Sequence, residues 1–166
     1  MIIWLTGLPC SGKTTIGETV RDALHSPLTP VEFLDSEAMR GCLWPELGYS
    51  EKDRSYNVAR LVFLARLLVR HGVTVIVAAV SPRRMDRLLA RALCPEGQFI
   101  EVHLACAPDI CMARDTRGVY EKFRNTGAGF IYEPPTDPEL VLRTGESMPG
   151  ECAARVVAYL RQHHGG

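Results

Sequence analysis

A glycine-rich segment of eight residues, Gly7 to Thr14 (GLPCSGKT), limits what this chain can fold into more than any other feature. It matches the pattern G-x-x-x-x-G-K-[ST] at every fixed position, directly after a short apolar run and directly before a helical pattern. In that context the glycines let the backbone wrap around phosphate oxygens, and the N-terminus of the following helix favours negative charge. The segment therefore predicts a strand, a phosphate-binding loop and a helix, in that order.

The residue types in this loop predict how it holds a nucleoside triphosphate. Lys13 is expected to reach the β- and γ-phosphates, and the Thr14 hydroxyl is expected to ligate Mg²⁺. The candidate ATP-binding residues of the loop are Gly7, Cys10, Ser11, Gly12, Lys13, Thr14 and Thr15. Two interpretations of Cys10 stay open: a thiol made reactive by the helix N-terminus, or a small residue that the loop tolerates.

Short apolar runs alternate with helical patterns along the chain. The predicted strands are Ile2–Thr6, Val31–Asp35, Val73–Val80, Phe99–Leu104 and Leu140–Arg143. The predicted helices start near Gly12, Glu51, Pro82 and Pro108, and a last one runs from about Pro149 to His163. This alternation predicts an α/β fold with three layers, in which helices flank a five-stranded parallel sheet. No linker divides the chain, so we expect residues 1–166 to form a single domain.

Three signals mark where the predicted helices begin and end. Ser50 can cap the helix from Glu51, with Asp53 three residues further on, and Gly72 follows that helix. Ser81-Pro82 is likewise typical of a cap followed by proline at the first helical position.

Composition excludes several classes of function. The chain has 19 basic and 19 acidic side chains, and a nucleic-acid binder would need a more basic surface. No apolar run approaches the roughly 20 residues of a membrane span. The six cysteines form no Cys-x-x-Cys pair, and the first residues lack the features of a signal peptide, so we expect a cytoplasmic protein. Arginine makes up 16 of the 19 basic residues, which favours anionic small molecules as ligands.

Two acidic residues, Asp35 and Glu37, follow the second predicted strand. The carboxyl ends of parallel strands border the crevice where such sheets bind ligands. There, one carboxylate can orient Mg²⁺ and the other can accept a proton from an attacking hydroxyl. Acidic residues are also typical of the first turn of a helix, which is the alternative interpretation. The candidate catalytic residues are therefore Lys13, Asp35 and Glu37, and the candidate metal ligands are Thr14 and Asp35.

Six segments, in order along nearly the whole chain, resemble the adenylylsulfate kinase family. The family patterns are GLxGSGKTT, LDGDxxR, GFSxxDRxxNxRR, a Ser-Pro after the third strand, RDxKGLY and PYExPxxPE. The corresponding segments here read GLPCSGKTT, LDSEAMR, GYSEKDRSYNVAR, VSP, RDTRGVY and YEPPTDPE. The combination is specific, although each piece apart from the first is weak alone.

The resemblance implies a P-loop kinase with a short lid at approximately residues 117–133. It implies that the enzyme uses ATP and Mg²⁺ to phosphorylate the ribose 3′-hydroxyl of adenosine 5′-phosphosulfate, giving 3′-phosphoadenosine 5′-phosphosulfate, and that it forms a homodimer. Position by position, it implies that Arg114 and Arg117 border the ATP. The acceptor-binding residues that it implies are Arg40, Tyr49, Arg54, Asn57, Ser81, Lys122 and Phe130.

Two of these residues, Tyr49 and Ser81, stand at positions to which the family assigns a specific role. Tyr49 replaces the phenylalanine that stacks on the acceptor adenine in the family, and it keeps the aromatic face. Ser81 matches a serine that is often labelled a phosphoserine intermediate. Direct in-line transfer requires no covalent step, so we expect Ser81 to cap a helix instead.

Three of the chain's departures from the family patterns matter most. Ser36 replaces glycine and Glu37 replaces aspartate, one arginine of the N-x-R-R run is missing, and the lid is several residues shorter. The lid lacks the family's Phe-Thr-Gly-Ile stretch, whose place Phe130 or Phe123 could take. A kinase for another acceptor, such as a cytidine-linked nucleotide or a small hydroxyl compound, is therefore one alternative. A regulatory nucleotide-binding module without transfer activity is another.

Overall fold

In the computed structural model, which describes residues 1–125 and 131–164, five parallel strands form one sheet in the order β2-β3-β1-β4-β5. The strands are β1 (Ile2–Thr6), β2 (Val31–Asp35), β3 (Thr74–Ala78), β4 (Phe99–Ala105) and β5 (Leu140–Arg143). The helices in the described part of the chain are α1 (Lys13–Leu24), α2 (Ser36–Leu43), α3 (Glu51–Arg70), α4 (Arg84–Ala92), α5 (Pro108–Ala113), α6 (Val119–Asn125) and α7 (Pro149–His164). The predicted α/β fold is confirmed.

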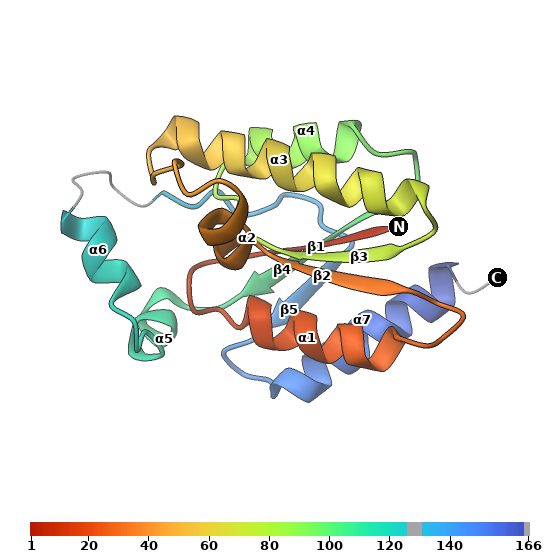
Figure 1. Ribbon diagram of the computed structural model, residues 1–166. Coiled ribbons are helices and arrows are strands. Elements are labelled where there is room, and N and C mark those ends of the chain that lie inside the picture. The colour runs from red at the N-terminus through yellow and green to blue at the C-terminus, as the bar shows by residue number, and fades with distance from the viewer. Residues whose placement is uncertain (126–130, 165–166) are drawn as a thin grey trace.

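Helices cover both faces of the sheet. Figure 1 shows α3 and α4 on one face and α1 and α7 on the other, while α5 and α6 extend beyond the carboxyl ends of the strands. The central strand β1 is buried on both sides because its side chains alternate between two apolar clusters. Ile3 and Leu5 pack with α1 and α7, whereas Ile2 and Trp4 pack with α3. None of the described helices is long and apolar enough to span a bilayer.

The ends of α3 follow the predicted signals. The Ser50 hydroxyl accepts a hydrogen bond from the backbone N–H of Asp53 at 3.2 Å, and it donates one to the Asp53 carboxylate at 2.7 Å. Gly72, two residues after the last helical residue, has a φ of 79°. A residue without a Cβ adopts this left-handed conformation without strain, which is why the helix ends there.

The prediction that Ser81 caps a helix is wrong. Helix α4 begins at Arg84, its N-cap position is Arg83, and no side chain caps it. Ser81 is buried with a φ of 42°, and its hydroxyl accepts the indole N–H of Trp4 at 2.9 Å. The Ser81 hydroxyl therefore makes a tertiary hydrogen bond with β1, whereas the local sequence predicted that it would cap a helix.

Two helices, α2 and α6, are additional to the predicted set. Helix α2 starts directly after β2 because Asp35 caps it. One carboxylate oxygen of Asp35 accepts the backbone N–H groups of Glu37 and Ala38, at 2.9 and 3.1 Å. The helix-start interpretation of this acidic segment is therefore confirmed.

The register of the sheet brings the site residues together. Ala78 of β3 lies opposite Asp35 of β2 on one side and opposite Leu5 of β1 on the other. The start of α2 and the loop that follows β1 are thus at the same edge of the sheet, separated by one strand.

Candidate active site

The phosphate-binding loop between β1 and α1 depends on backbone conformations that glycine supplies. Gly12 has a φ of 98°, and a Cβ added at Gly7 would lie 2.7 Å from the carbonyl oxygen of Leu104. Cys10 also adopts a positive φ, 61°, which is uncommon for a residue with a side chain. The loop is therefore fixed by close approach to β4 and by left-handed turns.

Lys13 lies across this loop. Its Nζ donates hydrogen bonds to the carbonyl oxygens of Gly7 and Leu8, at 3.0 and 2.6 Å. Burial lowers the pKa of Lys13 from its ordinary value to about 8. The ammonium group is held by neutral acceptors, which phosphate oxygens can replace.

Thr14 and Asp35 form the candidate metal site. The Thr14 hydroxyl donates to the second carboxylate oxygen of Asp35 at 2.7 Å, so the two predicted ligands are in contact. Hydroxyl and carboxylate oxygens are ligands that Mg²⁺ accepts, with phosphates and water completing its octahedral shell. These residues therefore fit the ion. In the part of the chain that the structure describes, no group of three or more His, Cys, Asp or Glu side chains forms a metal cluster.

Asp115 and the first turn of α6 contact the phosphate-binding loop. The Tyr120 hydroxyl donates to the carbonyl oxygen of Pro9 at 2.9 Å, and the Cys10 thiol lies 3.8 Å from the Asp115 carboxylate. Burial and the charge of Asp115 raise the pKa of the Cys10 thiol, which opposes the reactive interpretation. Sequence reasoning missed Asp115 and Tyr120 as contacts of this loop, although both belong to the RDTRGVY segment.

Two arginines surround the ring of Tyr49 on the other side of the site. The guanidinium carbons of Arg40 and Arg54 lie 4.9 and 5.9 Å from the ring centroid. Burial, and then the positive charge of Arg40, lower the pKa of Arg54. Among the described residues the buried Nε of Arg40 has no hydrogen-bond partner. An anion bound here would relieve the repulsion between the two guanidinium groups and could satisfy this N–H.

Three residues that depart from the family patterns, Ser36, Glu37 and Tyr49, take part in side-chain hydrogen bonds at this wall. The Tyr49 hydroxyl donates to the Glu37 carboxylate at 2.7 Å. The Asn57 amide donates to the Ser36 hydroxyl at 2.7 Å and accepts the indole N–H of Trp44 at 2.7 Å. The Asn57 side chain is therefore oriented from two sides.

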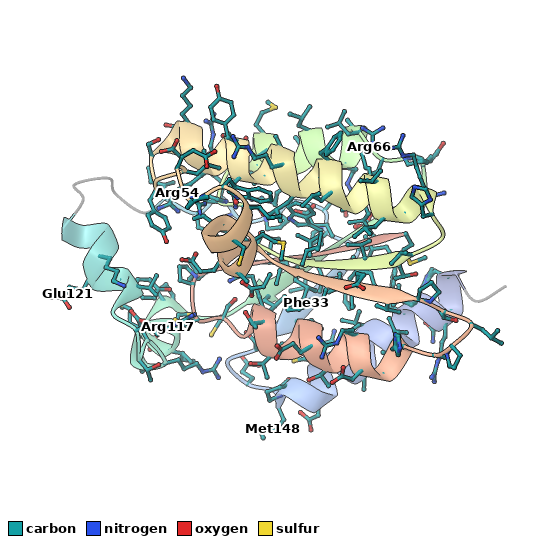
Figure 2. The ribbon with its side chains drawn as sticks, in the orientation of Figure 1. Phe33, Arg54, Arg66, Arg117, Glu121 and Met148 are labelled. Atoms are coloured by element: carbon teal, nitrogen blue, oxygen red, sulfur yellow. The ribbon has the colours of Figure 1, made fainter. Side chains whose placement is uncertain are left out.

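These walls enclose one cavity of about 910 Å³. In Figure 2, Arg54 beside α3 and Arg117 beside α5 and α6 lie at the same end of the molecule. The predicted site residues that line the cavity are Cys10, Ser11, Gly12, Lys13, Thr14, Thr15, Asp35, Glu37, Arg40, Tyr49, Arg54, Asn57, Ser81, Arg114, Arg117 and Lys122. Gly7, which lies close to Leu104 of β4, is not among the lining residues. Phe130 lies outside the described residues, and Phe123 belongs to α6.

Other residues line the cavity without having been predicted. Thr116 borders it beside Arg117, while Thr144 and Ser147 border it after β5. Arg114 reaches this segment, because its guanidinium donates to the carbonyl oxygen of Thr144 at 3.0 Å. No sequence pattern marks the turn after β5, so only the fold could reveal it.

A phosphate-binding loop that shares a cavity with an arginine-rich wall, at the carboxyl edge of a parallel sheet, defines the class of P-loop kinases. The fold and the site thus give the class, and comparison with known proteins gives the family. Residues 1–143 match the family model described as adenylylsulphate kinase, and the chain belongs to that family.

Individual relatives agree over nearly the full length. The adenylyl-sulfate kinase of Synechococcus sp. (strain JA-3-3Ab) is 42% identical over 167 residues, covering 97% of this chain and 94% of the relative. That of Acaryochloris marina is 38% identical over 167 residues, covering 97% and 82%. Among solved structures, the Mycobacterium tuberculosis APS kinase CysC in complex with AMPPNP and APS has a TM-score of 0.88 at 32% identity, with 96% of each chain covered.

Proposed function

We propose that this chain transfers the γ-phosphoryl group of ATP to the ribose 3′-hydroxyl of adenosine 5′-phosphosulfate. The products are 3′-phosphoadenosine 5′-phosphosulfate and ADP. The observation that carries this proposal is the single cavity in which the phosphate-binding loop faces the Arg40, Tyr49 and Arg54 wall. The chain's membership of the family and the APS-bound relative support the choice of acceptor.

The loop residues bind the donor. Backbone N–H groups of the loop and the N-terminus of α1 cradle the phosphates, and Lys13 pairs with the β- and γ-phosphates. Arg114 and Arg117 border the nucleotide from the α5 side. Thr14 and Asp35 would hold Mg²⁺, which when bound neutralises charge on the β- and γ-phosphate oxygens.

The opposite wall binds the acceptor. Arg40 and Arg54 pair with the phosphosulfate, the Tyr49 ring stacks on the adenine, and Asn57 contacts the ribose. Ser81 and Lys122 complete this side of the cavity. The buried Arg40 N–H and the lowered pKa of Arg54 both favour an anionic ligand at this wall.

Glu37 accepts the proton that the reaction releases. The acceptor oxygen forms a bond to the γ-phosphorus, the bond from that phosphorus to the bridging oxygen breaks, and ADP leaves with the electron pair. The hydroxyl proton moves to the carboxylate of Glu37. Because Glu37 is exposed at the start of α2, its carboxylate is accessible to a bound substrate.

The test is Glu37→Gln, which keeps the size of the side chain and removes the proton acceptor. We expect the dissociation constant for ATP to hold while kcat falls about 10²–10⁴-fold. Glu32→Gln, at an exposed position of β2 outside the cavity lining, is the matched control. A rate for Glu37→Gln within a few-fold of the wild type would remove Glu37 from the mechanism.

The acceptor itself is tested by following ADP release with ATP and Mg²⁺. We expect adenosine 5′-phosphosulfate to support turnover and cytidine nucleotides to give the background rate. Preference for a cytidine nucleotide would favour the redirected kinase instead. No turnover with any acceptor, while ATP still binds, would favour a regulatory module.

We also propose that the chain forms a homodimer in the cytoplasm. Self-association is supported by the apolar hollow of about 300 Å³ on the surface of α3, where Tyr56 and Phe63 are exposed. The cytoplasm is supported by the six cysteines, all of which are free thiols. Light scattering tests the first proposal, and a single-chain mass would overturn it.

A further inference from the structure

The carboxylate of Glu37 and the hydroxyl of Tyr49 come from different elements and meet at the edge of the cavity. Glu37 lies in the first turn of α2, and Tyr49 lies in the loop before α3. Their oxygens are 2.7 Å apart, which is a good distance for an O–H group donating to a carboxylate. The hydrogen bond therefore joins the two segments that carry the acceptor wall.

Tyr49 is itself held in place. The Nε of Arg54 donates to the carbonyl oxygen of Tyr49 at 2.9 Å, and the guanidinium of Arg40 lies against the ring. Arg40 also donates to the carbonyl oxygens of Leu47 and Gly48, directly before Tyr49. Burial, and then the hydrogen bond to Glu37, raise the pKa of Tyr49, so its hydroxyl keeps its proton at neutral pH. The hydroxyl is thus a fixed donor.

A glutamate at position 37 has more freedom than the aspartate of the family pattern. Its side chain has one more methylene and one more rotatable bond, so the start of α2 alone does not fix its carboxylate. The family pattern also has phenylalanine where this chain has Tyr49, and phenylalanine has no hydroxyl. The two departures from the pattern therefore form a contact that an aspartate and a phenylalanine cannot make.

We propose that Tyr49 is a positioning residue for Glu37, whose longer carboxylate its hydroxyl holds where it can accept the proton of the acceptor. This hydrogen bond occupies only the hydroxyl, so it does not itself prevent the ring from stacking on the acceptor base. This inference rests on the proposed function of Glu37 as the proton acceptor. The Tyr49 side chain then has two roles: its hydroxyl raises kcat by positioning Glu37, and its ring contributes to acceptor binding.

The experiment is a double-mutant cycle of Tyr49→Phe and Glu37→Asp, with kcat and both Michaelis constants measured for each variant. Tyr49→Phe should lower kcat about tenfold or more, because it frees a charged group that must be held within about 1 Å. Its Michaelis constants should change less than about twofold, because the ring remains. In the Glu37→Asp background the same change should alter kcat less than about twofold, because the shorter carboxylate no longer reaches the hydroxyl.

Matched variants separate this result from damage to the fold. Tyr159→Phe removes the hydroxyl of a half-buried tyrosine on α7, outside the cavity lining, and should keep wild-type kinetics. The melting temperature of Tyr49→Phe should remain close to that of Tyr159→Phe. If the Tyr49 hydroxyl had a purely structural role, Tyr49→Phe would lower the melting temperature, and it would do so whether residue 37 is glutamate or aspartate.

Two outcomes overturn the inference: a Tyr49→Phe rate within twofold of the wild type, or an equal loss from Tyr49→Phe whether or not Glu37→Asp is also present. Glu37→Gln separates this failure from failure of the proposed function. If Glu37→Gln lowers kcat while the cycle shows no coupling, only the positioning role is wrong. If Glu37→Gln retains the wild-type rate, the proton-acceptor role fails first and the positioning role with it.

Discussion

The two walls of the cavity are built from different kinds of contact. The donor wall is shaped mainly by backbone, through the left-handed conformation of Gly12 and the close approach of Gly7 to β4. The acceptor wall is shaped by side chains that hold one another, as Glu37 and Tyr49 do. A wall made of backbone tolerates few changes in sequence, whereas a wall made of side-chain pairs tolerates a change when both members change.

The departures from the family patterns follow this difference. On the donor wall, the loop keeps every residue that the pattern G-x-x-x-x-G-K-[ST] requires. Its departure from the family pattern, Cys10 in place of glycine, lies at a position with a φ of 61°, which glycine adopts without strain. On the acceptor wall, Ser36, Glu37 and Tyr49 all differ from the pattern, and each takes part in a side-chain hydrogen bond. Experiments that disturb each wall separately test whether the walls differ in this way.

The largest effect is expected from the donor wall, with Lys13→Ala. Transfer should fall by about 10³-fold or more, because the charge that stabilises the transferring phosphoryl group is lost. The fold should persist, because Nζ contacts oxygens of the loop itself. Steady-state kinetics and thermal unfolding measure the two effects, with Lys52→Ala on the exposed start of α3 as the control. Normal turnover would contradict the kinase mechanism entirely.

The donor wall is also the part of the site that sequence predicts best. The contacts of Lys13 and the turn at Gly12 arise within one short segment, so a local pattern suffices to predict them. The strands and the cap at Ser50 are predictable for the same reason, since periodicity and capping are local signals. The hydrogen bond from Tyr120 to Pro9 joins residues far apart in the sequence, so no pattern within the loop predicts it.

The acceptor wall shows where local reasoning stops. Local sequence predicts that Ser81 caps α4, but its hydroxyl instead accepts the indole N–H of Trp4, which is far away in the sequence, on β1. One carboxylate oxygen of Asp35 caps α2, as the helix-start interpretation expects, and the other accepts the Thr14 hydroxyl. The role of Asp35 as a metal ligand stays a prediction. The hydrogen bond between Glu37 and Tyr49 depends on how α2 packs near α3, which spacing along the chain does not determine.

The scaffold behind the acceptor wall gives the next largest effect. Arg87 is buried, and its guanidinium donates to Glu101 at 2.7 Å and to the carbonyl oxygens of Ser81 and Glu133 at 2.6 Å. Arg87→Met should lower the free energy of unfolding by about 3–5 kcal/mol, because it removes the 2.7 Å partner of the buried Glu101 carboxylate and leaves it the longer contact with Arg91, at 3.6 Å. Chemical denaturation measures the loss.

Arg155→Met is the matched control for this substitution. Arg155 is exposed on α7, and its guanidinium donates a hydrogen bond to the carbonyl oxygen of Val141 at 3.1 Å. We expect its free energy of unfolding to stay within about 0.5 kcal/mol of the wild type. Equal effects of the two substitutions would mean that the buried network adds nothing specific to the scaffold.

Removing the whole ring of Tyr49 should affect one substrate and spare the other. Tyr49→Ala should cost about 1–3 kcal/mol in acceptor binding, by analogy with base stacking on aromatic side chains. The Michaelis constant for adenosine 5′-phosphosulfate should rise accordingly, while that for ATP should not. Equal impairment of both substrates would instead indicate damage to the packing between α2 and α3.

The lid offers a related comparison. Phe130→Ala should reproduce the acceptor-specific effect of Tyr49→Ala if Phe130 stacks on the other face of the base. If Phe123 does so, the effect should appear in Phe123→Ala and be absent from Phe130→Ala. Michaelis constants for both substrates distinguish these outcomes. An acceptor Michaelis constant that neither substitution changes would exclude stacking by both phenylalanines.

The smallest expected effect concerns pH and again involves the donor wall alone. With a pKa of about 8, Lys13 of the free protein is protonated below that pH and increasingly neutral above it. Bound phosphates favour the charged form, so the lysine keeps its proton in the complex. ATP affinity should therefore be flat below pH 8 and should fall above it, by at most about tenfold per pH unit.

Calorimetric titration with ATP between about pH 7 and pH 9.5 tests this dependence. In buffers of different ionisation enthalpy, the same titrations should reveal uptake of up to one proton near pH 9. Lys13→Met provides the control, with weaker affinity and no such uptake. An affinity that stays constant through pH 9.5 would mean that Lys13 keeps its proton in the free loop. The hydrogen bonds to the carbonyl oxygens of Gly7 and Leu8 would then stabilise the charged form of Lys13 by more than burial destabilises it.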